Sequence, residues 1–283
     1  TLLDHFGMKG FKGKTVALKA NFNSADRFPA STHPDTVATL VRSLKNAGAK
    51  KITLAERSGM GVTEEVVRDL GIMDLSSSLG FDVNILDRVP EGGWILVKKP
   101  DNHWERGFLF AKVFRDADSI VQTCCLKTHR FGGHFTLSLK NSVGMVAKMD
   151  PGDRYDYMNE LHSSPYQRLM IAEINREYKP TLVVLDGTEA FVTEGPDKGQ
   201  LVRPGVILAG EDRVALDAVA VGILRLFGTT PEVSKGKIFE QEQLARAAEL
   251  RVGAKSFEET EIVPLGKPAE DFVKKLEGVL ARS

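Results

Sequence analysis

The first third of the chain alternates short apolar runs with amphipathic stretches. Residues 15–21 and 51–56 are apolar runs of strand length, whereas residues 34–47 and 62–70 place their apolar residues at helical spacing. This strand–helix–strand–helix order predicts βαβ units, because parallel neighbouring strands need a long crossover connection, usually a helix. The sequence therefore predicts an α/β fold with a mostly parallel, doubly wound, Rossmann-like sheet and helices on both faces.

Later segments extend this pattern with two additions. Further strands are predicted over residues 82–86, 119–122, 182–185 and 206–210, and a helix capped by Asp212 over residues 212–227. Residues 88–117 interrupt the alternation and predict an inserted hairpin or small subdomain, and residues 236–283 predict a C-terminal helical region. We expect residues 1–283 to form a single α/β domain that carries both additions.

Charge and cysteine content narrow the class of partner. The chain has 38 Lys and Arg residues and 38 Asp and Glu residues, which favours a small molecule over nucleic acid or a membrane surface. The two cysteines, Cys124 and Cys125, are adjacent and cannot form a disulfide framework. A reducing, cytoplasmic location is therefore expected, with export after removal of a leader as the alternative. The oligomeric state is left open.

Residues 124–144 hold the densest collection of reactive side chains. Lys127, His129, His134 and Lys140 come shortly after a predicted strand, so we expect them at the carboxyl edge of the sheet, where open α/β folds bind ligands. The intervening glycines permit a turn that directs both imidazoles to one point, as a metal ion or an acid–base pair requires. We predict these four residues to be catalytic; a turn cap and a solvated histidine are the alternative.

The two lysines favour binding of an anion. A lysine partly withdrawn from water acts as an anion clamp or, with a lowered pKa, as a base or Schiff-base nucleophile. For Lys127 and Lys140 we favour a clamp for carboxylate or phosphate over covalent chemistry, and ordinary surface lysines are the alternative. Thr128 and Asn141 adjoin them and are predicted to bind the same ligand.

A second cluster follows the strand predicted over residues 182–185. Asp186 ends that strand and Glu194 lies in the next glycine-containing loop, an arrangement typical of divalent-cation ligands or general bases. We predict a metal site formed by Asp186, Glu194 and His129, with the identity of the metal open. The alternative is that Asp186 only shapes the turn before Gly187.

The amino-terminal strand and helix contribute a third group. Lys19 and Asn21 end the first predicted strand, and His33 precedes Pro34 at the start of a helix. An N-cap followed by proline explains His33 structurally, and the same helix start offers amide donors to an anion. Lys19, Asn21 and His33 are therefore predicted to bind the ligand.

Several of these segments together resemble the domain of unknown function 362 family. The resemblance is carried by residues 19–21, 31–34, 126–129, 136–141, 186–187, 205–210 and 217–218. Members of that family are often described with an attached ferredoxin-like domain that holds iron–sulfur clusters. This chain has no C-x-x-C-x-x-C run, so the resemblance implies no intrinsic cluster and suggests a separate iron–sulfur protein as partner.

Two functional hypotheses follow. The first is an enzyme that acts on a small anionic metabolite, a carboxylate or phosphate, by metal-dependent racemase or oxidoreductase chemistry. The racemase version is an analogy, because two histidines and a lysine in one site resemble the arrangement of nickel-pincer lactate racemases. The second is a non-catalytic ligand-binding or scaffold protein that docks on an iron–sulfur partner. The first hypothesis requires the three groups of side chains to meet in one cavity.

Overall fold

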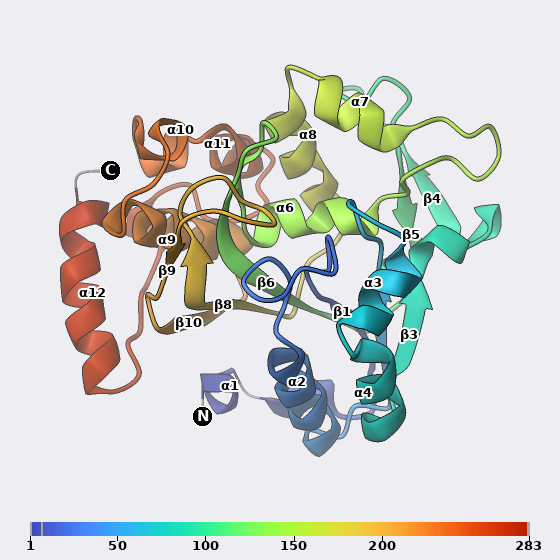
Figure 1. The fold of residues 1–283 in the computed structure, drawn as a ribbon, viewed down its shortest axis with the longest axis horizontal. Helices are drawn as coiled ribbons and strands as arrows, with labels where there is room; N and C mark the ends of the chain where they lie inside the picture. Colours follow the sequence, from blue (N-terminus) through green and yellow to red (C-terminus); the bar gives the residue numbers. More distant parts are fainter. Residues whose placement is uncertain (1, 7, 282–283) are drawn as a thin grey trace.

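The computed structural model describes residues 2–6 and 8–281 (Figure 1). Within these residues, eight strands form the main sheet, in which six follow the order β10-β8-β6-β1-β2-β3, while β7 pairs with β6 and β9 with β8. The strands are β1 (Thr15–Lys19), β2 (Lys51–Glu56), β3 (Asp82–Ile85), β6 (Ser119–His129), β7 (His134–Thr136), β8 (Leu182–Phe191), β9 (Leu201–Val202) and β10 (Val206–Gly210).

The sheet is mostly parallel, and its chain order reverses in the middle. Strand β1 pairs in parallel with β2 and β6, β2 with β3, and β6 with β8, whereas β7, β9 and β10 are antiparallel additions. From β1 the chain first builds towards the β3 edge, and it then returns to build β6, β8 and β10 on the other side. This reversal between β1 and β6 is the position at which doubly wound folds open a ligand site.

Helices cover both faces of the sheet, as the sequence predicts. They are α1 (Leu2–His5), α2 (Pro34–Asn46), α3 (Thr63–Asp69), α4 (Ile72–Leu79), α5 (Lys112–Arg115), α6 (Ser138–Asn141), α7 (Tyr157–Ser163), α8 (Gln167–Ile174), α9 (Arg213–Leu226), α10 (Pro231–Ser234), α11 (Glu242–Glu249) and α12 (Lys267–Leu280). Figure 1 shows α2 and α4 on one side of the sheet, and α6, α8 and α9 on the other.

The alternation of side chains along β8 explains the two covered faces. Leu182 and Val184 pack into the core that contains the apolar residues of α2, whereas Val183 and Leu185 pack into the core that contains those of α9. Successive side chains of a strand point to opposite faces, so an uninterrupted apolar run needs cover on both sides. The predicted α/β fold class, with a mostly parallel sheet, is confirmed.

Two central strands are longer than their apolar runs. Strand β6 continues through His129, and β8 continues to Phe191. The register between them shifts after Cys125, so that Cys125 pairs with Asp186 but Leu126 pairs with Ala190. Asp186 therefore lies within β8 at a bulge, and the prediction that it ends the strand was wrong. The sequence does not show this continuation, because several of its residues are polar. Burial and backbone pairing between the two strands hold these residues in a strand.

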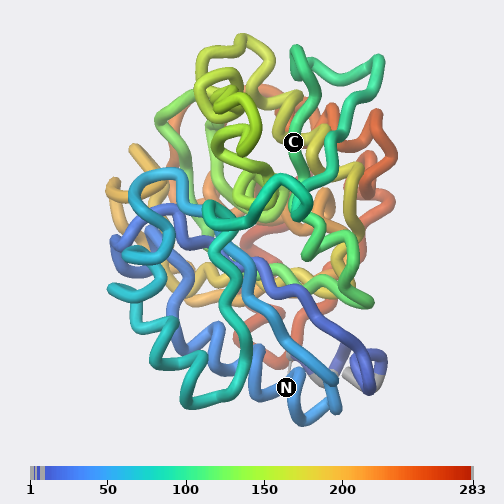
Figure 2. The backbone as a smooth tube through the Cα atoms, turned by 90° about the vertical axis from the view of Figure 1, so that its right-hand side faces the viewer, coloured from blue at the N-terminus to red at the C-terminus, as the bar shows by residue number. Residues whose placement is uncertain are grey.

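A separate two-stranded antiparallel sheet lies within residues 88–117, where the sequence indicates an insertion. It consists of β4 (Trp94–Val97) and β5 (Phe108–Ala111). Figure 2 shows the teal segment near residue 100 beside the yellow-green segment near residue 150, in agreement with an Arg106–Asp153 ion pair of 2.5 Å. None of the helices in the described part of the chain combines the length and hydrophobicity needed to cross a bilayer.

Candidate functional site

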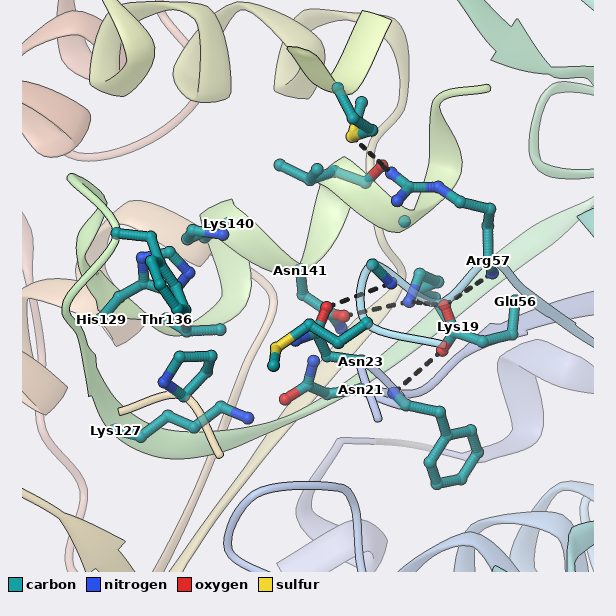
Figure 3. A pocket seen from close by; sticks show the side chains of 18 of the residues that line it. Lys19, Asn21, Asn23, Glu56, Arg57, Lys127, His129, Thr136, Lys140 and Asn141 are labelled. Atoms are coloured by element: carbon teal, nitrogen blue, oxygen red, sulfur yellow. Dashed lines mark hydrogen bonds and ion pairs between the residues drawn. The ribbon is translucent and has the colours of Figure 1, made fainter. Parts of the chain in front are cut away.

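A small cavity opens at the carboxyl ends of β1, β2 and β6, at the reversal of strand order. Its volume is about 100 Å³. Figure 3 shows side chains from β6, β7 and α6 on one side and from β1 and β2 on the other, with asparagines between them. The polar side chains that line the cavity are Lys19, Asn21, Asn23, Glu56, Arg57, Lys127, His129, Thr136, Lys140, Asn141 and His162.

A buried ion pair forms one wall of the cavity. The Nζ atom of Lys19 lies 2.5 Å from Oε1 of Glu56 and donates to Oδ1 of Asn141 at 3.1 Å. Burial lowers the pKa of Lys19 and raises that of Glu56, and the attraction between the two groups opposes both shifts. Lys19 therefore ties β1 to β2 and α6, and its charge is matched within the protein.

Strand geometry separates Lys127 and His129 from Thr128. Alternate residues of β6 share a face, and Lys127 and His129 both line the cavity. Thr128 instead donates its hydroxyl to the carbonyl of Phe191 at 3.3 Å and accepts the amide of Gly195 at 3.2 Å. The structure thus gives Thr128 a role in joining β6 to the loop after β8, outside the cavity lining.

Lys140 is a buried cation without a counter-ion. Among the described residues its ammonium has no hydrogen-bond acceptor and no ion-pair partner, and the residue is 9% exposed. Burial, reinforced by repulsion from Lys127 and Arg57, lowers the pKa of Lys140 to about 7. The amine is therefore partly neutral at physiological pH, and an anion that enters the cavity will stabilise its protonated form.

The imidazole of His129 is neutral and has a free ring nitrogen. Burial, followed by the charge of Lys140, holds the pKa of His129 well below its ordinary value. Within the described chain, three buried polar atoms of the cavity lining have no hydrogen-bond partner: Nδ1 of His129, Oγ1 of Thr136 and Oδ1 of Asn21. Buried polar atoms in native proteins are nearly always paired, so these atoms indicate a polar ligand or water in the cavity.

Two glycines allow the side chains to approach. A Cβ atom on Gly133 would lie 2.8 Å from Cε of Lys140 and 2.9 Å from Nδ1 of His129. A Cβ atom on Gly144 would lie 2.7 Å from Nζ of Lys19 and 2.8 Å from the Glu56 carboxylate. All four distances are shorter than real Cβ contacts, so a larger residue at either position would displace these side chains.

We expect Gly144→Ala to lower the free energy of unfolding by about 1–3 kcal/mol, the usual cost of overpacking a buried site. The added methyl group would push Lys19 and Glu56 apart. Gly278→Ala in α12 is the matched control, because nothing lies within 4 Å of its added Cβ atom and alanine favours a helix. Chemical denaturation of both variants measures the difference; equal stabilities would show that the Gly144 contact is not restrictive.

Asp217 anchors the short helix that carries Lys140. Its carboxylate accepts hydrogen bonds from the Ser138 amide at 2.9 Å, the Ser138 hydroxyl at 2.6 Å and the Leu139 amide at 2.8 Å. Burial raises the pKa of Asp217 to about 7, while these donors favour the charged form. Asp217 thereby joins α9 to the start of α6, and so positions Lys140 without lining the cavity itself.

Two predicted histidines do not line the cavity. His134 pairs with His129 across β6 and β7, at a backbone φ of 64°, but its side chain is not part of the lining. His33 caps α2, accepts the Asp35 amide at 3.1 Å and leaves 47% of its side chain exposed. The expectation that two imidazoles meet at one point was wrong for His134, because the hairpin turn places it outside.

The predicted carboxylates also lie outside the cavity. Asp186 accepts hydrogen bonds from the hydroxyls of Thr36 at 2.9 Å and Thr188 at 2.7 Å. Glu194 is exposed. Within residues 2–6 and 8–281, no group of three His, Cys, Asp or Glu side chains is placed to hold a metal ion. The expected convergence of Asp186 and Glu194 with His129 is not found, because the β8 bulge turns Asp186 towards α2.

The cavity also contains residues outside the predicted set of catalytic, ligand-binding and metal-binding residues. Glu56 and Arg57 stand at the end of β2, Thr136 ends β7, and His162 belongs to α7. A signal for Glu56 was present in the sequence, because Lys19 and Glu56 end two consecutive predicted strands with opposite charges. Neighbouring parallel strands place such ends side by side.

Three comparisons relate the chain to known proteins. The chain is 28% identical over 233 residues to a thylakoid-associated protein of Synechocystis sp., covering 80% of this chain and 68% of that protein. The lactate racemase apoprotein of Thermoanaerobacterium thermosaccharolyticum aligns with 74% of this chain at a TM-score of 0.46 and 13% identity, and the chain spans 49% of its length. The family model for the domain of unknown function DUF362 matches residues 16–222, which include every cavity-lining residue. The chain belongs to the DUF362 family.

Proposed function

We propose that this protein is an enzyme that acts on a small carboxylate or phosphate held in the cavity between Lys127 and Lys140. The supporting observation is the charge balance of the cavity. Among the described residues, the basic groups Lys127, Lys140 and Arg57 have no carboxylate within ion-pair distance, whereas Glu56, the one carboxylate in the lining, is paired with Lys19. A buried pocket with more basic than acidic side chains favours an anion.

The size of the cavity limits the ligand. Its volume of about 100 Å³ is below the roughly 300–1,000 Å³ of pockets that bind drug-sized ligands. A short-chain acid or inorganic phosphate suits a cavity of this size better than a nucleotide. The restricted volume supports a metabolite over a polymer or a large cofactor as the molecule that occupies this position.

Two of the lining groups suit proton transfer. A catalytic acid or base works best when its pKa lies close to the operating pH, and the pKa of Lys140 is lowered to about 7. His129 is neutral and has an unpaired Nδ1 atom on the same side of the cavity (Figure 3). Of the two reaction types, racemisation and oxidoreduction, these groups support racemisation directly, because it needs a proton to be removed and returned. Cytoplasmic location and an iron–sulfur partner stay predictions from the sequence.

Lys140→Met is expected to weaken binding of a small carboxylate or phosphate by about ten- to a hundredfold, the loss of one charge-assisted hydrogen bond worth about 1.5–3 kcal/mol. Isothermal titration calorimetry with lactate, malate, phosphate and glycerol 3-phosphate measures the change. Lys179→Met removes an exposed lysine outside the cavity and is the matched control. Equal affinities in both variants would contradict the proposal, and tight binding without turnover would favour a carrier.

A further inference from the structure

We propose that Lys140 is a nucleophile that condenses with the carbonyl group of a small oxo compound bearing a carboxylate or phosphate. This inference rests on the proposed function and narrows it, because the anion must then carry an aldehyde or a ketone. It goes beyond a clamp role for Lys140, in which the amine stays protonated and forms no bond to the ligand.

The three buried lysines of the described chain differ in their partners. Lys19 is paired with Glu56 and Asn141, and the ammonium of Lys127 donates to the backbone carbonyl of Ala30. Lys140 has neither kind of partner and lines the cavity. A buried amine without a counter-ion gains from losing its proton, and the free amine is the form that attacks a carbonyl carbon.

The cations near Lys140, namely Lys127 and Arg57, favour both the reaction at the carbonyl group and the binding of the anionic group. Lys127 and Arg57 lower the pKa of Lys140 by repulsion, so they help to keep its amine free. Both also line the cavity, where they attract the carboxylate or phosphate of the ligand. An anion bound towards these two groups brings its carbonyl carbon close to the amine, since Lys140 lines the same small cavity.

His129 is placed to move the protons of the condensation. Its Nδ1 atom and Cε of Lys140 both lie within 3 Å of the Cβ position of Gly133, so the two side chains flank the same glycine. The amine nitrogen attacks the carbonyl carbon, the carbonyl π electrons move to oxygen, and the imidazole carries a proton from nitrogen to that oxygen. The imidazole then moves the remaining N–H proton of the carbinolamine to the hydroxyl, the C–O bond breaks, and the nitrogen lone pair forms the C=N bond as water leaves, without any change of oxidation state.

Reductive trapping tests the inference on the full chain. The protein is incubated with pyruvate or dihydroxyacetone phosphate and sodium cyanoborohydride, and intact mass and peptide mapping locate any adduct. We expect one reduced adduct per chain, on Lys140, with formation falling as the pH drops below about 7. Acetone, which lacks the anionic group, should label at least tenfold more slowly. Lys179→Met should behave as the unmodified protein, whereas Lys140→Arg should give no adduct.

The outcomes separate this inference from the proposed function. Labelling spread over exposed lysines, or located on Lys127, overturns the assignment of the nucleophile. Lactate and glycerol 3-phosphate carry the same anionic groups without a carbonyl, so their binding is measured in parallel by calorimetry. Binding of these anions without any trapped adduct overturns the imine and leaves the proposed function standing. Failure of both binding and trapping overturns both. Mapping on the unmodified protein needs no variant to fold.

Discussion

Glu56→Gln is expected to lower the free energy of unfolding by about 3–5 kcal/mol, the usual cost of leaving one member of a buried ion pair without its partner. The substitution removes the charge that matches Lys19 while leaving the ammonium buried, with both side chains at most 2% exposed. The backbone amides of Phe22 and Arg57 donate to different oxygens of the Glu56 carboxylate, and a glutamine has only one acceptor oxygen, so the substitution also breaks one of these two hydrogen bonds. Denaturant unfolding followed by circular dichroism measures it.

A double variant provides the control for this prediction. Lys19→Met combined with Glu56→Gln removes both charges, and it should be less destabilised than the sum of the two single variants. That difference reports the coupling between the two groups directly. If the single and double effects add, Lys19 and Glu56 are not an interacting pair, and the wall of the cavity is held in some other way.

Asp217→Ala is also expected to have a large effect and to lower the free energy of unfolding by about 3–5 kcal/mol. It leaves the amides of Ser138 and Leu139 buried without acceptors and frees the turn before Lys140. Anion binding should weaken as well, because the position of Lys140 depends on α6. Asp69→Ala removes an exposed aspartate and should change stability by less than about 0.5 kcal/mol. Similar stabilities for the two variants would contradict the anchoring role.

The pH dependence of Asp217 has a definite sign. Its pKa is about 7 in the folded protein, against a value near 3.8 for an unperturbed group. Between these two pH values the folded state holds a proton that the unfolded state has released, so the contribution of Asp217 to stability falls as the pH rises from about 4 to 7. The stability of the unmodified protein relative to Asp217→Asn should fall over this range; a constant difference would contradict the shift.

Much of the fold was predictable because its signals are local. The apolar runs and helical periodicities around β1, α2, β2 and α9 specify strands, helices and caps, and the Asp212 cap of α9 is confirmed. The extension of β6 was not predictable in the same way. Lys127, Thr128 and His129 do not read as a strand, and their buried conformation depends on pairing with β8, β7 and the loop after β8.

The site was predictable in part for the same reason. Lys19, Asn21, Lys127 and His129 stand at or just after strand ends, Lys140 and Asn141 stand in the short helix α6, and the strand order brings them together. Asp186 and Glu194 were misplaced because a bulge in β8 has no clear mark in the sequence. Asp217 was missed as an anchor, since its contact with Ser138 joins positions 79 residues apart.

A crystal structure of the protein soaked with a small carboxylate or phosphate tests the central claim most directly. Our account predicts density for the anion within hydrogen-bond distance of the ammonium groups of Lys127 and Lys140, with the Lys19–Glu56 pair intact beside it. An anion bound elsewhere, or lysine side chains of residues 127 and 140 that extend into solvent away from each other, would contradict the account.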